Sequence, residues 1–237
     1  MLIAAAVCPH PPLLIPAATG VSGPGDRELQ RLRTACHEAV ARLSAAAPDL
    51  VVVVGGAERT GDYPPQTPGS LRRYGVPWGE DRAPVLPLSL TIGRWLLTQG
   101  ADVSGADCSG AALWGIAADA PPAECLELGE KIAMLAPRVA MLAMGDGPGR
   151  RARGAPGARD PAADRYDEAV MAAMAAPSPG ALAALDPAAD ADLFIAGRAA
   201  WQVLAGAVGQ DEFTATLAYA AAPFEVSYVV ASWRRAH

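Results

Sequence analysis

The stretch LIAAAVCPHPPLLIP, residues 2–16, decides the fold of this chain. Its first six residues are apolar without alternation, which predicts a strand buried on both faces. The run ends at Cys8-Pro9-His10-Pro11-Pro12, whose prolines lack backbone donors, so His10 is expected in a rigid loop after the strand. Open α/β sheets bind ligands at this end of their strands, so His10 is the first candidate for chemistry. A hydrogen-bonded loop residue is the alternative role.

The rest of the chain continues the alternation of helix and strand. A helix at residues 26–47 and a valine-rich strand at 50–54 follow the first strand, which implies a right-handed parallel crossover. Further strands are predicted at 85–90, 138–144 and 223–233, and further helices at 92–99, 123–135, 164–174, 179–185 and 192–208. A long irregular segment at 63–80 is rich in proline and glycine, as lids and interface segments often are. The prediction is a single three-layer α/β domain over residues 1–237, with a central, mostly parallel sheet and helices on both faces.

Composition limits the classes of partner. The chain has 237 residues, of which 51% are hydrophobic, enough for a substantial core. A net charge of −6, without a basic run interleaved with aromatic residues, predicts no nucleic-acid partner. No apolar run approaches the roughly 18 residues of a membrane span, so no membrane partner is expected. The cysteines lack C-x-x-C spacing, which predicts reduced thiols and a cytoplasmic protein.

The motif C-P-H-P-P-L-L-I-P after an N-terminal strand resembles the start of the class III extradiol ring-cleavage dioxygenases, the family of the protocatechuate 4,5-dioxygenase beta subunit. The resemblance continues in order along nearly the whole chain. It implies the α/β fold of that family, opening of a catechol ring and a non-haem Fe(II) ion bound by His10. It also implies a homo-oligomer.

The metal ligands that the resemblance implies are only partly present. Such a site needs two histidines and a carboxylate on one face of the iron. In the family a second histidine follows the second strand, where Glu58 is the one nearby side chain here that could bind a metal. Its alternative role is a surface carboxylate paired with an arginine. The family's third ligand is a glutamate one turn before a tryptophan, but this chain has Gly197 before Trp201. Fe(II) is therefore expected to be lost, or replaced by Zn²⁺ at a rebuilt site.

The resemblance also points to residues for proton transfer and substrate binding. Cys108 stands where the family has a histidine, although a buried structural thiol is the alternative. After the strand at 138–144, the family's acid/base histidine is replaced by residues that do not titrate, and Asp146 is the remaining candidate, or else a turn residue. Arg150 and Arg151 are candidate ligands for an anionic substrate, or else part of a solvated loop.

Three functions follow from these observations. The first is a degenerate homologue that cleaves no ring and acts as a binding or structural subunit, with a small aromatic or anionic ligand. The second is a metalloenzyme, an oxidoreductase or hydrolase, whose rebuilt site joins Cys8, His10, Glu58, Cys108 and Asp146. The third is a metal-free enzyme with Cys8 or Cys108 as nucleophile and His10 as base.

Overall fold

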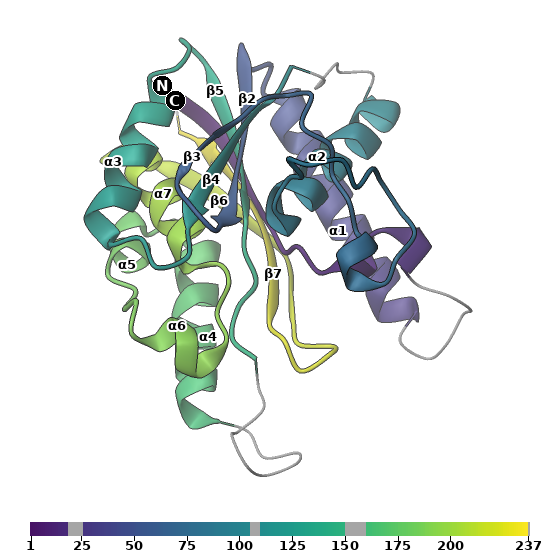
Figure 1. The fold of residues 1–237 in the computed structure, drawn as a ribbon. Coiled ribbons are helices and arrows are strands. Elements are labelled where there is room, and N and C mark those ends of the chain that lie inside the picture. The colour runs from purple at the N-terminus through teal and green to yellow at the C-terminus, as the bar shows by residue number, and fades with distance from the viewer. Residues whose placement is uncertain (19–25, 105–109, 150–159, 237) are drawn as a thin grey trace.

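The computed structural model describes residues 1–18, 26–104, 110–149 and 160–236. Its centre is a seven-stranded sheet in the order β3-β4-β2-β5-β1-β7-β6, with helices on both faces (Figure 1). The strands are β1 (Leu2–Cys8), β2 (Leu50–Ala57), β3 (Gly61–Tyr63), β4 (Ala112–Ala117), β5 (Val139–Met144), β6 (Phe213–Ala221) and β7 (Tyr228–Arg235). The predicted three-layer α/β fold is confirmed.

The middle of the sheet is parallel. Strand β5 pairs in parallel with β1 on one side and with β2 on the other, and β2 pairs in parallel with β4. The outer strands β3, β7 and β6 are antiparallel to their neighbours. Strands β1 and β5 are buried along their whole length, which explains their uninterrupted apolar sequences. The carboxyl ends of four parallel strands therefore meet at one edge of the sheet.

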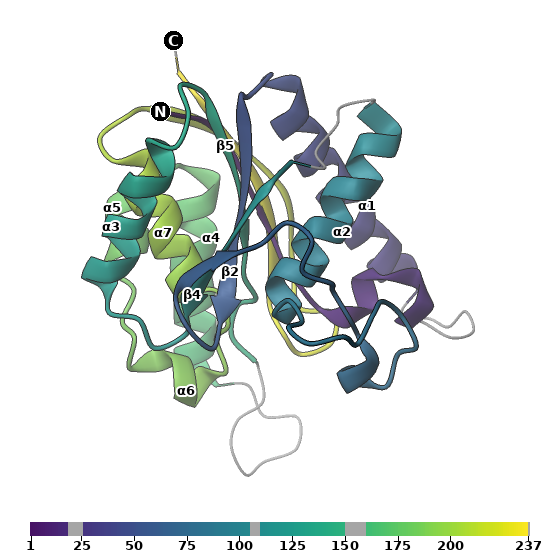
Figure 2. The same ribbon diagram turned by 45° about the horizontal axis from the view of Figure 1, so that its top comes forward.

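Two groups of helices cover the two faces, as Figures 1 and 2 show from different sides. Helices α1 and α2 lie on one face, and α3, α4, α5 and α7 lie on the other. The helices are α1 (Asp26–Ala45), α2 (Leu88–Ser104), α3 (Pro122–Ala133), α4 (Pro161–Ala175), α5 (Pro179–Ala183), α6 (Ala189–Leu193) and α7 (Arg198–Val208), with 3₁₀ turns η1 (Pro12–Leu14), η2 (Pro16–Ala18) and η3 (Arg72–Tyr74). Within the described ranges, no helix combines the length and apolar character of a membrane span.

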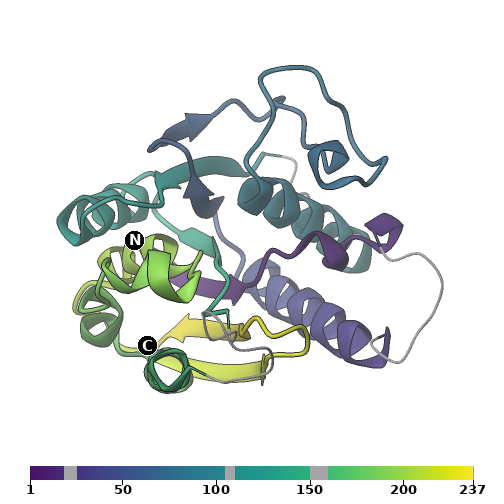
Figure 3. The same ribbon diagram turned by 60° about the horizontal axis from the view of Figure 1, so that its bottom comes forward.

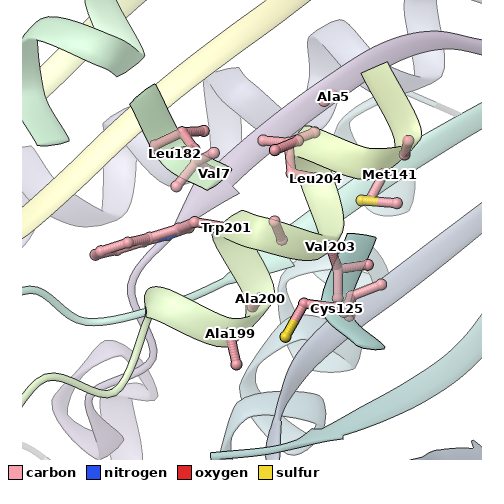
Figure 4. Packing of buried hydrophobic residues seen from close by; sticks show 14 of the residues in the cluster. Ala5, Val7, Cys125, Met141, Leu182, Ala199, Ala200, Trp201, Val203 and Leu204 are labelled. Carbon is pink, nitrogen blue, oxygen red and sulfur yellow. The ribbon is translucent and has the colours of Figure 1, made fainter. Parts of the chain in front are cut away.

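Helix α7 is buried on all sides and forms the centre of one core layer. Figure 4 shows its side chains Trp201, Val203 and Leu204 among residues of the strands, such as Val7, and of α5. Each of the three is inaccessible to solvent. Apart from Arg198 and Gln202, α7 is apolar on every side, and such a helix belongs in this position because it has no face suited to water.

The structure corrects some predicted elements. No strand forms at 85–90; instead α2 begins at Leu88, since the flanking prolines cannot donate to a sheet ladder. The helix predicted at 192–208 is divided into α6 and α7 by residues 194–197, where Phe194 has a left-handed backbone (φ 55°). The last strand begins at Tyr228 rather than at residue 223, and β6 precedes it.

Candidate functional site

His10 lies at the carboxyl edge of the sheet, directly after β1. Figure 3 turns this edge toward the viewer. The residue is 7% exposed, so its imidazole is a buried polar group rather than a surface one. It is held between the end of β1 and the 3₁₀ turn η1, as the prolines predict.

The loop that carries His10 is anchored by a buried arginine of α1. Arg33 Nε donates to the backbone oxygen of Leu14 at 2.8 Å, and its Nη2 donates to that of Leu13 at 2.7 Å. Hydrogen bonds from a charged group are stronger than neutral ones, so the guanidinium fixes the turn against α1. The position of His10 thus depends on α1 as well as on β1.

Asp146, two residues after the end of the neighbouring strand β5, is the partner of His10. The backbone N–H of His10 donates to Asp146 Oδ1 at 2.8 Å, and His10 Nδ1 lies 3.6 Å from the same oxygen. The second distance is too long for a hydrogen bond, and Nδ1 has no other hydrogen-bond partner among the described residues. Gly145 N–H donates to the Cys8 oxygen at 3.0 Å, which joins the two strand ends. The carboxylate therefore holds the His10 loop and leaves the imidazole nitrogen unsatisfied.

The thiols of Cys8 and Cys36 and the phenol of Tyr228 lie near His10 and Asp146. Burial, followed by the neighbouring Cys8, raises the pKa of the Cys36 thiol well above its usual value, and the charge of Asp146 adds to the effect. Burial and the same carboxylate raise the pKa of Tyr228. Cys8 itself is inaccessible to solvent. Cys8 thus lacks the exposure that a reactive cysteine needs.

The other predicted site residues do not join this pair. Glu58 is exposed in the turn after β2. Cys108, Arg150 and Arg151 lie outside the described residues. Across the parts of the chain that the structure describes, no three His, Cys, Asp or Glu side chains are grouped so that they could bind a metal ion.

Arg198 occupies the start of α7, next to the position where the resemblance implies a metal-binding glutamate. It is 1% exposed, and its guanidinium donates to the backbone oxygens of Ala118 (2.5 Å) and Ala120 (2.8 Å), just after β4. It also donates to Asp190 Oδ2 at 2.7 Å and to Gln202 Oε1 at 2.9 Å. A cation with these bonds fixes α7 to the end of β4.

The described residues do not fit a ferrous extradiol site. Such a site needs two imidazoles and a carboxylate facing one metal. Here the edge presents one imidazole, whose nearest carboxylate accepts the N–H of its own loop. The helix position that would add a second carboxylate is Gly197, and the residue after it is the buried cation Arg198.

Comparison with known proteins adds evidence on the fold. No family model and no curated protein matches this sequence. Among solved structures, the chain is similar to the uncharacterized protein JW3007 from Escherichia coli K12, with a TM-score of 0.50 and 17% identity. The match covers 97% of this chain and 99% of that chain. At this identity the similarity concerns the fold, over almost the full length of both proteins.

Two important residues were not identified from the sequence. The helix predicted at residues 26–47 contains Cys36, but nothing in the sequence connects this thiol with Cys8. Arg198 follows Gly197 in the sequence, and an arginine inside an otherwise apolar helix is itself a signal, because a buried guanidinium needs partners.

Proposed function

We propose that the chain is a non-cleaving homologue of the class III extradiol dioxygenases, which binds a small aromatic or anionic molecule at the carboxyl edge of its sheet. One observation carries the proposal: at that edge the His10 imidazole faces Asp146, and among the described residues no third metal-binding side chain joins them. A scaffold with this donor set is suited to binding rather than to activating dioxygen.

The unsatisfied His10 nitrogen supports a binding role. A buried polar atom without a partner costs about 1–3 kcal/mol. Nδ1 is inaccessible to solvent, so a ligand hydroxyl would pair with it after a small shift of the imidazole, and that pairing would remove this cost. The anchored loop favours such binding, because a group already fixed in position loses little entropy when the ligand arrives.

The test is titration of 3,4-dihydroxybenzoate into the full chain by calorimetry without oxygen, followed by admission of oxygen in the presence of Fe(II). We expect saturable binding that is weakened about tenfold or more in His10→Ala, equivalent to 1.4 kcal/mol. We expect no ring-opened product by absorbance. The matched control is His37→Ala, which alters the other described histidine and should leave the affinity unchanged.

The remaining outcomes of this test argue against the proposal. Ring-opened product that disappears in His10→Ala would establish a dioxygenase with a rebuilt site. Absence of saturable binding would overturn the ligand-binding role.

We further infer that the protein resides in the cytoplasm. The described free cysteines, Cys8, Cys36 and Cys125, are all buried, which suits a reducing compartment.

We also infer that the protein self-associates. Strand β6 supports this inference, because it is an edge strand without charged residues and such edges readily pair with another chain.

A further inference from the structure

The two ends of the chain lie close together at the edge of the sheet opposite His10 (Figure 1). A groove lies near this edge. It has a volume of about 270 Å³ and separates the last turns of α1 from β1, β7 and β6. Its lining consists of Ala4, Ala5, Arg42, Leu43, Ala45, Thr214, Thr216, Ser232, Trp233 and Arg234.

Small side chains on one face of the sheet create this groove. Ala4 is paired with Arg234, which is paired with Thr214, so the three share a face. Ser232 and Thr216 are paired in the same way one step along the strands. Alanine, serine and threonine do not fill the space beneath α1. The floor of the groove therefore presents hydroxyl groups beside a guanidinium.

The groove is positively charged. Arg42 reaches across it from α1 and donates to Thr216 Oγ1 at 3.2 Å. Arg234 is exposed, and its guanidinium has no hydrogen-bond or ion-pair partner among the described residues. No aspartate or glutamate belongs to the lining. Two arginines thus face the same space without a carboxylate to neutralise them.

An adjoining cavity of about 300 Å³ shares Arg234 with the groove. Its other arginines already have partners: Arg235 is paired with Asp211 at 2.7 Å, and Arg138 donates to the backbone oxygens of Ala46 and Ala47. Arg138 thereby covers the negative carboxyl end of α1, which would otherwise repel an anion. Arg234 is therefore the arginine that can bind an anion in either the groove or the adjoining cavity.

We propose that this groove binds the phosphate or carboxylate group of a small molecule. Arg42 and Arg234 contact the anion from opposite walls, and the hydroxyls of Thr214, Thr216 and Ser232 donate to it. Leu43 contacts a short apolar part. Guanidinium groups suit this task, because they pair with phosphate or carboxylate through two parallel hydrogen bonds. The volume is near the lower limit of ligand pockets, about 300 Å³, which selects a small ligand.

The proposal is tested by calorimetric titration of the full chain with inorganic phosphate and, separately, with butyrate, at constant ionic strength. We expect saturable binding of at least one anion. The anion that binds more tightly shows whether the groove prefers a phosphate or a carboxylate group. Affinity should fall at least tenfold in the double variant Arg42→Gln/Arg234→Gln. Circular dichroism checks that the double variant is folded. Both arginines are exposed, so their replacement should not disturb the fold.

Matched variants separate this groove from general charge effects and from the His10 site. Arg73→Gln removes one exposed arginine elsewhere, and His10→Ala alters the other edge of the sheet; both should retain anion affinity. Thr216→Val should weaken binding without a change in charge. Equal binding by wild type and the Arg42→Gln/Arg234→Gln variant, or no saturable binding of either anion, would overturn the proposal.

Discussion

Arg198 is the residue on which the junction between α7 and the end of β4 depends. Its guanidinium is buried and donates to the Asp190 carboxylate, to Gln202 and to two backbone oxygens. Burial raises the pKa of Asp190, and the charge of Arg198 opposes that shift. Each charge is therefore tolerated because the other is present.

Replacement of Arg198 by methionine should lower the free energy of unfolding by about 3–5 kcal/mol, since it leaves a carboxylate and two carbonyls without their donor. Arg198→Lys should be intermediate, because one ammonium cannot reproduce the planar set of donors. Urea denaturation measures both. Arg73→Met is the control at an exposed position and should change stability by less than about 0.5 kcal/mol. Equal stability of Arg198→Met and the control would contradict this account.

His37 should make stability depend on pH. It packs against Trp95 with ring centroids 5.9 Å apart, and burial, followed by the charge of Arg33, lowers its pKa below 6.5. Between the folded and unfolded pKa values, the unfolded chain binds the proton and the folded chain does not. The free energy of unfolding should therefore fall as pH decreases below about 6.5.

The measurement is urea denaturation at a series of pH values, compared with His37→Gln. The variant should lose part of the slope between neutral pH and the folded-state pKa. An identical slope in both proteins would show that His37 is not the group responsible.

At the scale of elements, two glycines determine how closely α3 and α7 pack. A Cβ on Gly129 would overlap the backbone oxygen of Val203, and a Cβ on Gly206 would overlap that of Leu126. The two backbones are thus in direct contact, and neither helix can move away without opening the core around Trp201.

Gly206→Ala should lower the free energy of unfolding by about 1–3 kcal/mol, because the added methyl group meets backbone rather than a flexible side chain. Gly180→Ala in α5 is the matched control, since nothing lies within 4 Å of its Cβ. It should be neutral or raise stability by up to about 1 kcal/mol. Thermal unfolding compares the two variants. A Gly206→Ala protein as stable as Gly180→Ala would show that the close approach of α3 and α7 does not require glycine at this position.

The elements that could be predicted are those whose burial is uniform. Strands β1 and β5 and helix α1 follow from continuous or periodic apolar residues. Strand β6 was not predicted, because it lies at the sheet edge with mostly exposed residues and lacks a buried run. Residues 85–90 resemble a strand in composition, but the prolines and the packing of Leu90 in the core place the start of α2 there.

At the scale of the whole molecule, the candidate site shows where sequence reasoning stops. The prolines around His10 were enough to place it in a rigid loop at the carboxyl edge. Its contact with Asp146 joins residues 136 positions apart, and it exists because β1 and β5 are neighbours in the sheet. The order of strands is a property of the complete fold, so no local pattern could reveal this pair.

The sheet also separates two different environments. Its carboxyl edge holds a buried imidazole, thiols and a carboxylate, and its other edge holds an arginine-lined groove. We propose that both are binding sites and that the molecule has a dioxygenase-like scaffold, whose described residues lack the ligand set for iron.

The most direct test of this account is the metal content of untagged protein purified without oxygen, measured by plasma mass spectrometry beside His10→Ala. We expect iron and zinc far below one ion per chain, at the same level in both proteins. Near-stoichiometric iron or zinc that falls in His10→Ala would contradict it and would establish a rebuilt metal site around His10.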